Sequence, residues 1–282
     1  MQSSELDCRL QIVRDIVRAA GDAVLQYYDK TVAVAWKAPD DPVTAADHAA
    51  NALILEQLYR HFPGEPVLAE ESEDDMSRLG HNVIWMVDPL DGTKEFLKHN
   101  GEFSVMVGLV EHGRPVLGAV MQPAPPSGIK PGALYSGAIG LGAWLSLGSS
   151  ERPIRVTNVD QLSHMRMVAS RSHFDPRVDQ LRKRLGIHKI LHHGSVGLKC
   201  GMIATGACEL YIHPSSRVSL WDSCAPAAIL MAAGGMMTDL LGQPLTYTAV
   251  EIHHRQGLLA SNGRLHDKVV AMIQEAGLAA EA

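Results

Sequence analysis

The feature that most limits the possible folds is the apolar run Val83–Val87, which leads directly into acidic residues. An unbroken run of this kind is typical of a strand buried on both faces, rather than one with a solvated side. The next residues are Asp88-Pro-Leu-Asp91-Gly-Thr93, so two carboxylates follow the carboxyl end of the predicted strand. The run therefore predicts a sheet covered by other layers, with acidic side chains at its edge.

Helices and a meandering sheet are predicted for the rest of the first half. Apolar residues recur every three or four positions from Leu6, which indicates a long amphipathic helix. A second helix is predicted from Thr44 to about His61, because Thr44 and Asp47 have the spacing of a capping box. Further strands are expected at residues 103–111, 115–122, 134–138 and 143–147.

The second half alternates between strands and helices after the polar stretch 148–152. Strands are expected at 165–169 and 210–212, and helices at 176–185, 196–205, about 221–234 and 265–276. We therefore expect an N-terminal α+β half, residues 1–152, that carries most of the acids discussed below. A C-terminal α/β half would comprise residues 153–282.

Composition and charge exclude several classes of protein. The 282 residues are 46% hydrophobic and 20% charged, as in ordinary globular proteins, and the net charge is -6 without a basic run. Binding to polymeric nucleic acid is therefore not expected. No stretch approaches the roughly 18 apolar residues of a membrane span, so we predict a cytoplasmic protein without a transmembrane segment. The four cysteines are widely spaced, which predicts reduced thiols rather than disulfides or a zinc site.

Acidic residues also follow or begin other predicted elements. Each has a plain structural explanation: Glu70 and Glu71 could belong to a solvated loop, Asp222 could sit at a helix start, and Asp47 could serve as a cap. As an ordered set with Asp88 and Asp91 they are far more specific. Oxygen ligands suit Mg2+, and the amides of a helix start suit phosphate, so the set predicts a metal-assisted phosphate site.

This ordered set resembles the inositol monophosphatase superfamily of Mg2+-dependent, lithium-sensitive phosphatases over nearly the whole chain. The resemblance implies a layered αβαβα sandwich of α/β (α+β) class and two or three Mg2+ ions per active site. It also implies that Asp47 and Thr93 act together on the attacking water, with Glu70 and Asp91 counted as catalytic. The implied metal ligands are Glu70, Asp88, the Leu90 carbonyl, Asp91 and Asp222.

Lys94-Glu95-Phe96 and Asn100-Gly101-Glu102-Phe103 are similar to the 3'(2'),5'-bisphosphate nucleotidase (CysQ-type) branch. That branch implies removal of the 3'-phosphate of adenosine 3',5'-bisphosphate by a monomer or homodimer. The implied substrate contacts are Leu90, Asp91, Gly92, Thr93, Ser170, His173, Ser195, Lys199 and Asp222. From the residues alone, Ser170, His173, Ser195 and Lys199 could equally belong to a pair of helix caps.

Two alternatives remain open at this point. Within the same class, the chain could hydrolyse inositol-1-phosphate or fructose-1,6-bisphosphate. From another class, it could be a non-catalytic binding protein that kept the fold; such proteins usually lose a metal ligand or the water-orienting pair. Here Asp47, Thr93 and the four acidic metal ligands are all present, which favours an enzyme.

Overall fold

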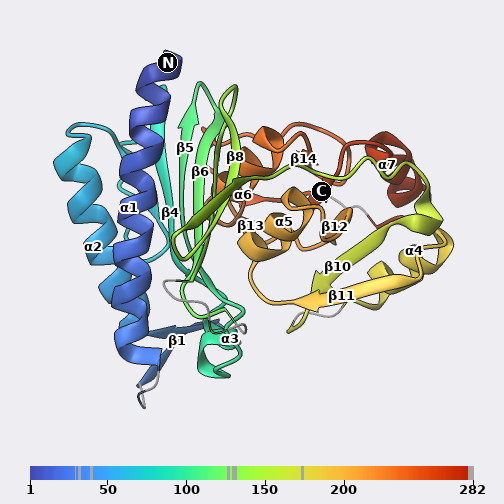
Figure 1. Ribbon diagram of the computed structural model, residues 1–282, viewed down its shortest axis with the longest axis horizontal. Coiled ribbons are helices and arrows are strands. Elements are labelled where there is room, and N and C mark those ends of the chain that lie inside the picture. The colour runs from blue at the N-terminus through green and yellow to red at the C-terminus, as the bar shows by residue number, and fades with distance from the viewer. Residues whose placement is uncertain are drawn as a thin grey trace.

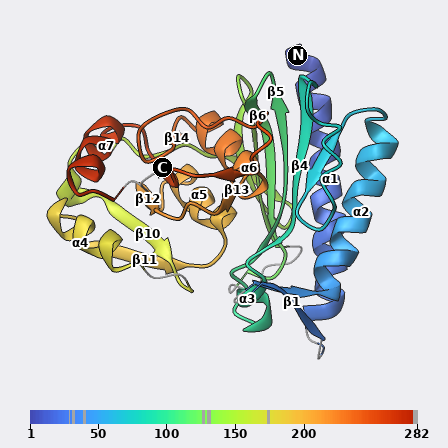
Figure 2. The same ribbon diagram turned by 180° about the vertical axis from the view of Figure 1, so that it is seen from behind.

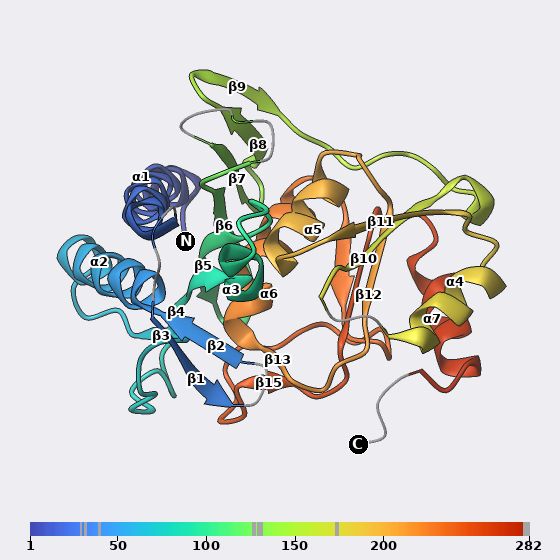
Figure 3. The same cartoon turned by 90° about the horizontal axis from the view of Figure 1, so that it is seen from below.

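The computed structural model describes residues 1–28, 30, 33–38, 41–125, 128, 132–172 and 175–278. Five layers succeed one another in Figure 1: helices, a larger sheet, helices, a smaller sheet and helices. The first layer holds α1 (Ser3–Tyr28) and α2 (Ala45–His61), which lie side by side on one face of the larger sheet (Figure 2). Viewed from below, α4 (Pro176–Arg184) and α7 (His266–Glu275) lie on the opposite flank of the molecule (Figure 3). The predicted αβαβα sandwich is confirmed.

The larger sheet has seven strands in the described part of the chain, ordered as in the sequence from β3 to β9. Only the β3–β4 pair is parallel; the other described neighbours are antiparallel. The strands are β3 (Val67–Ala69), β4 (Val83–Asp91), β5 (Ser104–Glu111), β6 (Arg114–Gln122), β7 (Ala133–Ala138), β8 (Gly142–Leu147) and β9 (Ser150–Pro153).

Two details of this sheet differ from the sequence prediction. Strand β4 is buried as expected, but it continues to Asp91 with an irregular register after Asp88, so Asp88 lies within the strand and not at its end. Residues 150–153 form the exposed edge strand β9 instead of a loop. Their polar side chains gave no apolar signal, because nothing covers them at the edge of the sheet.

The smaller sheet has the order β11-β10-β12-β16-β14. Strand β10 (Arg166–Ser170) is parallel to β11 (Lys189–His193) and to β12 (Leu210–His213), whereas β16 (Leu258–Ser261) and β14 (Met236–Thr238) add antiparallel neighbours. In β14, Met236 is 41% exposed, whereas Met237 is 6% exposed and packs in the core. The predicted division of the chain at 152/153 stays a prediction.

Short elements lie outside the two sheets. Strands β1 (Val34–Ala38) and β2 (Asp41–Thr44) form a hairpin before α2, and α3 (Thr93–Leu97) follows β4. The hairpin and α3 lie at the same end of the larger sheet (Figure 1). Strands β13 (Val218–Ser219) and β15 (His253–His254) pair next to the start of α6, and η1 (Leu162–His164) precedes β10.

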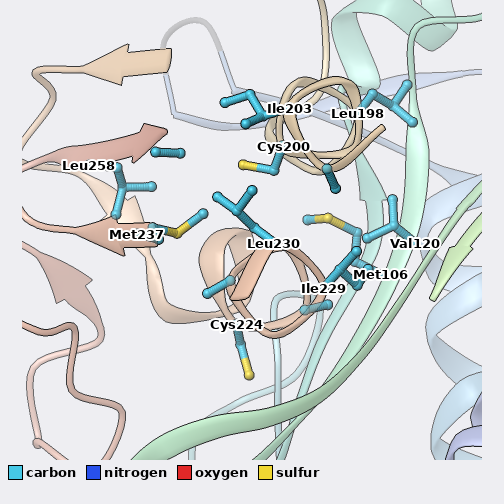
Figure 4. Packing of buried hydrophobic residues seen from close by; sticks show 14 of the residues in the cluster. Met106, Val120, Leu198, Cys200, Ile203, Cys224, Ile229, Leu230, Met237 and Leu258 are labelled. Atoms are coloured by element: carbon cyan, nitrogen blue, oxygen red, sulfur yellow. The ribbon is translucent and has the colours of Figure 1, made fainter. Parts of the chain in front are cut away.

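The middle layer consists of α5 (Val196–Ala204) and α6 (Leu220–Ala232), packed between the two sheets. Figure 4 shows Met106 and Val120 of the larger sheet on one side of these helices, and Met237 and Leu258 of the smaller sheet on the other. Close approach to the larger sheet depends on Gly118, where an added methyl group would lie 2.2 Å from the Ala225 carbonyl oxygen of α6. The absence of a side chain at Gly118 therefore lets α6 pack directly against β6 of the larger sheet.

None of the helices in the described ranges is long and apolar enough to cross a lipid bilayer. The four cysteines are free, as predicted, and three of them are buried. Burial raises the pKa of Cys200 to about 12. A thiol with so high a pKa is a poor nucleophile, so Cys200 serves packing rather than chemistry.

The pH dependence of stability can be tested at His266, which is 2% exposed and whose ring nitrogens hydrogen-bond the Thr238 and Ser261 hydroxyls. Burial lowers its pKa to about 4. The unfolded chain therefore binds the extra proton more tightly, so stability is complete above about pH 6.5 and declines as the pH falls towards 4. We expect His266→Asn to remove on the order of 2 kcal/mol of this pH dependence, measured by urea unfolding at pH 7 and pH 4.5.

The exposed His188 provides the matched control. His188→Asn should follow the wild-type pH profile. An unchanged profile in His266→Asn would show that His266 does not contribute to the acid sensitivity of the fold.

Candidate active site

The predicted acids come from four elements that meet at one end of the larger sheet. Asp47 is in the first turn of α2, Glu70 follows β3, Asp88 and Asp91 are in β4, and Asp222 is in the first turn of α6. The site therefore joins elements of both predicted halves.

Asp47 both closes the start of α2 and reaches Thr93. Its Oδ2 atom accepts hydrogen bonds from the Thr44 amide at 2.8 Å and the Thr44 hydroxyl at 2.7 Å, which confirms the predicted capping box. Its Oδ1 atom lies 3.1 Å from the Thr93 hydroxyl. Burial raises the pKa of Asp47, although the hydrogen bonds from Thr44 and Thr93 oppose this shift.

Thr93 has one hydroxyl hydrogen and two acceptors within reach. Besides Asp47, the Leu90 carbonyl oxygen lies 3.2 Å from its Oγ1 atom. A carboxylate is the stronger acceptor of the two because it is charged. The pair expected to orient water is thus assembled, and the Leu90 carbonyl is directed into the same space.

The four predicted acidic metal ligands are close enough to affect one another's ionisation. Burial, followed by the charges of Glu70, Asp91 and Asp222, raises the pKa of Asp88 well above its usual range. The pKa of Asp222 is also raised well above its usual range, first by burial and then by the charges of Asp91 and Glu70. Carboxylates from distant parts of the chain therefore lie near one another in the fold.

Two of these acids, Asp88 and Asp222, are held by hydrogen bonds from backbone amides near them in the sequence. The Leu90 amide donates to Asp88 Oδ1 at 3.0 Å, and the Ser219 amide donates to Asp222 Oδ2 at 2.8 Å. The Asp222 contact belongs to a capping box with Ser219 at the start of α6. The backbone thus fixes the directions of the carboxylates despite their repulsion.

Lys37 is a site residue that the sequence analysis missed. Its Nζ atom lies 2.7 Å from Glu70 Oε1 and also donates to Glu71. Burial raises the pKa of Glu70 to about 7, against the opposing charge of Lys37 and with a further contribution from Glu71. Lys37 lies in β1, a short strand that forms a hairpin with β2. Because so few residues carry no recognisable strand pattern, the sequence did not predict this strand.

The donor set fits a hard divalent cation. The candidate donors are carboxylate oxygens and one carbonyl oxygen, and the Lys37 ammonium group bridges Glu70 and its neighbour Glu71. Across the described residues, no three Asp, Glu, His or Cys side chains are arranged to hold a metal ion as they stand. The acids therefore converge without forming a closed cage in this conformation, and metal binding would require side-chain adjustment.

The predicted distal contacts fall into two groups. Ser170 ends β10 and lines a small pocket with Asp175 and His213, whereas His173 lies outside the described residues. Ser195 and Lys199 are buried, at 5% and 3% exposure. Ser195 donates a hydrogen bond to Asp91, and Lys199 lies over the Tyr211 ring with Nζ 3.3 Å from the Gly194 carbonyl oxygen.

Two glutamates of the motifs after Thr93 connect the halves. The Arg171 guanidinium donates two hydrogen bonds of 2.6 Å to Glu102, which also accepts from the Gly194 amide. Glu95 accepts hydrogen bonds from Ser172 and from Asn100. These contacts fix the ends of β10 and β11 beside α3, a role that the sequence pattern alone did not reveal.

Known proteins resemble this chain in sequence and in overall fold. The profile of the inositol monophosphatase family matches residues 5–278. The chain is 38% identical over 255 residues to 3'(2'),5'-bisphosphate nucleotidase CysQ of Escherichia coli K12, covering 89% of this chain and 99% of the relative. It is 26% identical over 265 residues to inositol-1-monophosphatase of Bacillus subtilis strain 168, covering 92% and 94%.

Among solved structures, CysQ from Bacteroides thetaiotaomicron superposes with a TM-score of 0.74 at 28% identity, covering 90% of this chain and 97% of that chain. That structure is described as a bacterial member of the inositol monophosphatase family. The similarity spans both sheets, so it concerns the whole fold and not one motif.

The crowding of acids predicts a conflict between function and stability at Asp88, which is 1% exposed. Its raised pKa means that the folded state holds the proton more tightly than the unfolded state, so stability falls as the pH rises above about 4. In EDTA at pH 8, Asp88→Asn should therefore be more stable than wild type by about 1–2 kcal/mol, measured by urea unfolding. The exposed Asp160 supplies the control, Asp160→Asn, which should leave stability unchanged. A destabilised Asp88→Asn would refute the claim of repulsion.

Proposed function

The chain belongs to the inositol monophosphatase family, and from this premise we propose that it is a Mg2+-dependent phosphatase that removes the 3'-phosphate of adenosine 3',5'-bisphosphate. The observation that carries the proposal is the Asp47–Thr93 hydrogen bond beside four converging acids. A water-orienting pair next to a cation site can supply what metal-assisted hydrolysis of a phosphate monoester requires. A binding protein of the same fold would need neither part of the pair.

Glu70, Asp88, the Leu90 carbonyl, Asp91 and Asp222 would hold two or three Mg2+ ions. Enzymes of this family generally depend on metal ions, and the oxygen donors described above suit Mg2+. When bound, Mg2+ would lower the pKa of a water molecule and offset negative charge on the phosphate and the leaving oxygen.

Thr93 and Asp47 would handle the proton of the attacking water. The Thr93 hydroxyl donates its hydrogen to Asp47, so the lone pairs of Oγ1 remain available to accept a hydrogen bond. Oγ1 can then accept a hydrogen bond from the attacking water, which directs the water oxygen towards phosphorus. As the water loses its proton, the carboxylate of buried Asp47 stabilises the positive charge that develops on Thr93. The amides of Gly92 and Thr93, at the start of α3, would bind the phosphate oxygens.

The nucleoside part of the substrate would lie beyond Asp91, towards the ends of β10 and β12. Ser170, Asp175 and His213 line the pocket there. After these parallel strands the chain continues to opposite sides of the sheet, because β11 lies beside β10 on one side and β14 lies beyond β12 on the other. Ligands of open α/β sheets bind at such switch points. We therefore assign Ser170 to nucleotide recognition, whereas the predicted contact of His173 lies outside the described residues.

Phosphate release from a panel of substrates tests the proposal. Wild type with Mg2+ should show a higher kcat/KM for adenosine 3',5'-bisphosphate than for inositol-1-phosphate or fructose-1,6-bisphosphate, and EDTA should abolish release from all three. A preference for inositol-1-phosphate would overturn the assignment of substrate. Release that continues undiminished in EDTA would overturn the metal-dependent mechanism.

The water-orienting role predicts that Thr93→Ala lowers kcat by about 10²–10⁴-fold. Affinity for Mg2+ and KM should change little, because Thr93 Oγ1 is proposed to contact water rather than metal or nucleoside. Steady-state kinetics at saturating Mg2+ measure the effect. Thr205, whose hydroxyl bonds the Gly201 carbonyl within α5, gives the control Thr205→Ala, which should retain wild-type kcat. A wild-type rate in Thr93→Ala would remove this residue from the mechanism.

A further inference from the structure

Ser195 makes an unusually close contact with one of the proposed metal ligands. Its hydroxyl donates to Asp91 Oδ2 at 2.5 Å, and the Gly197 amide donates to the same oxygen at 3.0 Å. Both donors lie at the start of α5, whereas Asp91 ends β4 in the larger sheet. One oxygen of the Asp91 carboxylate is therefore held by two donors from a different layer of the fold.

The hydrogen bonds around Ser195 use its full capacity. The hydroxyl has one hydrogen, and the charged Asp91 carboxylate takes it. The Ser104 hydroxyl, 2.9 Å away, must then be a donor to Ser195, and the Leu198 amide donates to the same oxygen at 3.1 Å. Ser195 Oγ thus donates once and accepts twice, so it has no hydrogen left for a substrate.

The backbone at Ser195 has an uncommon conformation that places its hydroxyl group against Asp91. Ser195 has φ of +48°, which is uncommon for a residue with a side chain and costs energy unless its surroundings enforce it. Its neighbours allow the close approach, because an added methyl group at Gly197 would lie 2.5 Å from Met106 Sδ, and at Gly194 2.5 Å from the Glu102 carbonyl oxygen. Packing of α5 on the larger sheet thus places the hydroxyl against Asp91.

We infer that Ser195 is a positioning residue that fixes the Asp91 carboxylate for metal binding, rather than a substrate contact. Two donors on Oδ2 restrict the side chain to one rotamer and leave Oδ1 as the oxygen available to a cation. The inference rests on the proposed function, since it assigns Asp91 to the metal site. It replaces the substrate contact that the sequence resemblance implied for Ser195.

Direct metal binding tests this role without relying on turnover. Titration of metal-free protein with Mg2+ in a calorimeter should show a 10–100-fold weaker Kd in Ser195→Ala than in wild type. At saturating Mg2+, the KM for adenosine 3',5'-bisphosphate should stay close to the wild-type value. Ser104→Ala is the matched control: it removes a neighbouring buried hydroxyl but leaves the Ser195–Asp91 hydrogen bond, so its Kd should change much less.

A second variant covers the case in which Ser195→Ala does not fold. Ser195→Gly also lacks the hydroxyl but accepts the positive φ without strain, and it should show the same weakened Kd. A wild-type Kd for Mg2+ combined with a raised KM in either folded variant would overturn the inference and return Ser195 to the substrate contacts. Failure of the proposed function would be distinct: wild type would bind Mg2+ but release no phosphate from any substrate in the panel.

Discussion

Repulsion between carboxylates is the constraint on which the rest of the structure depends. Asp88 is buried and lies within the electrostatic reach of Glu70, Asp91 and Asp222, so each negative charge makes the others more costly to ionise. A chain left to its local preferences would turn these side chains towards water. The surrounding fold must therefore hold them together, and the layered architecture provides the necessary rigidity.

The fold holds the acids by giving each one donors on part of its carboxylate. Asp47 and Asp222 accept the hydrogen bonds of helix capping boxes, Asp88 accepts one from the Leu90 amide, and Asp91 accepts two from the start of α5. These donors come from backbone amides and short hydroxyl side chains, which move little once the helices are packed. Close packing at Gly118 fixes α6 against the larger sheet, and close packing at Gly194 and Gly197 does the same for the start of α5.

Much of this arrangement could be predicted from the sequence, for identifiable reasons. Long amphipathic helices and the buried run at Val83–Val87 have strong periodic signals, and the ordered acids indicated one shared site. The short strands β1, β2, β13 and β15 were missed because their pairing depends on distant partners and not on local pattern. For the same reason the contacts of Lys37 with Glu70 and of Ser195 with Asp91 could not be predicted, since both cross between separate elements. Arrangement of the acids around a metal ion stays a prediction.

Asp47 and Asp222 each complete a helix capping box, so both stabilise the fold whether or not the protein is catalytically active. A descendant of this chain that lost its activity would still gain helix stability from both acids, on the order of 1 kcal/mol each, and selection for folding alone would retain them. Their presence in another sequence is therefore weak evidence for a working enzyme. Thr93 caps no helix with its side chain, so its identity is the more informative marker when active and inactive relatives are to be told apart.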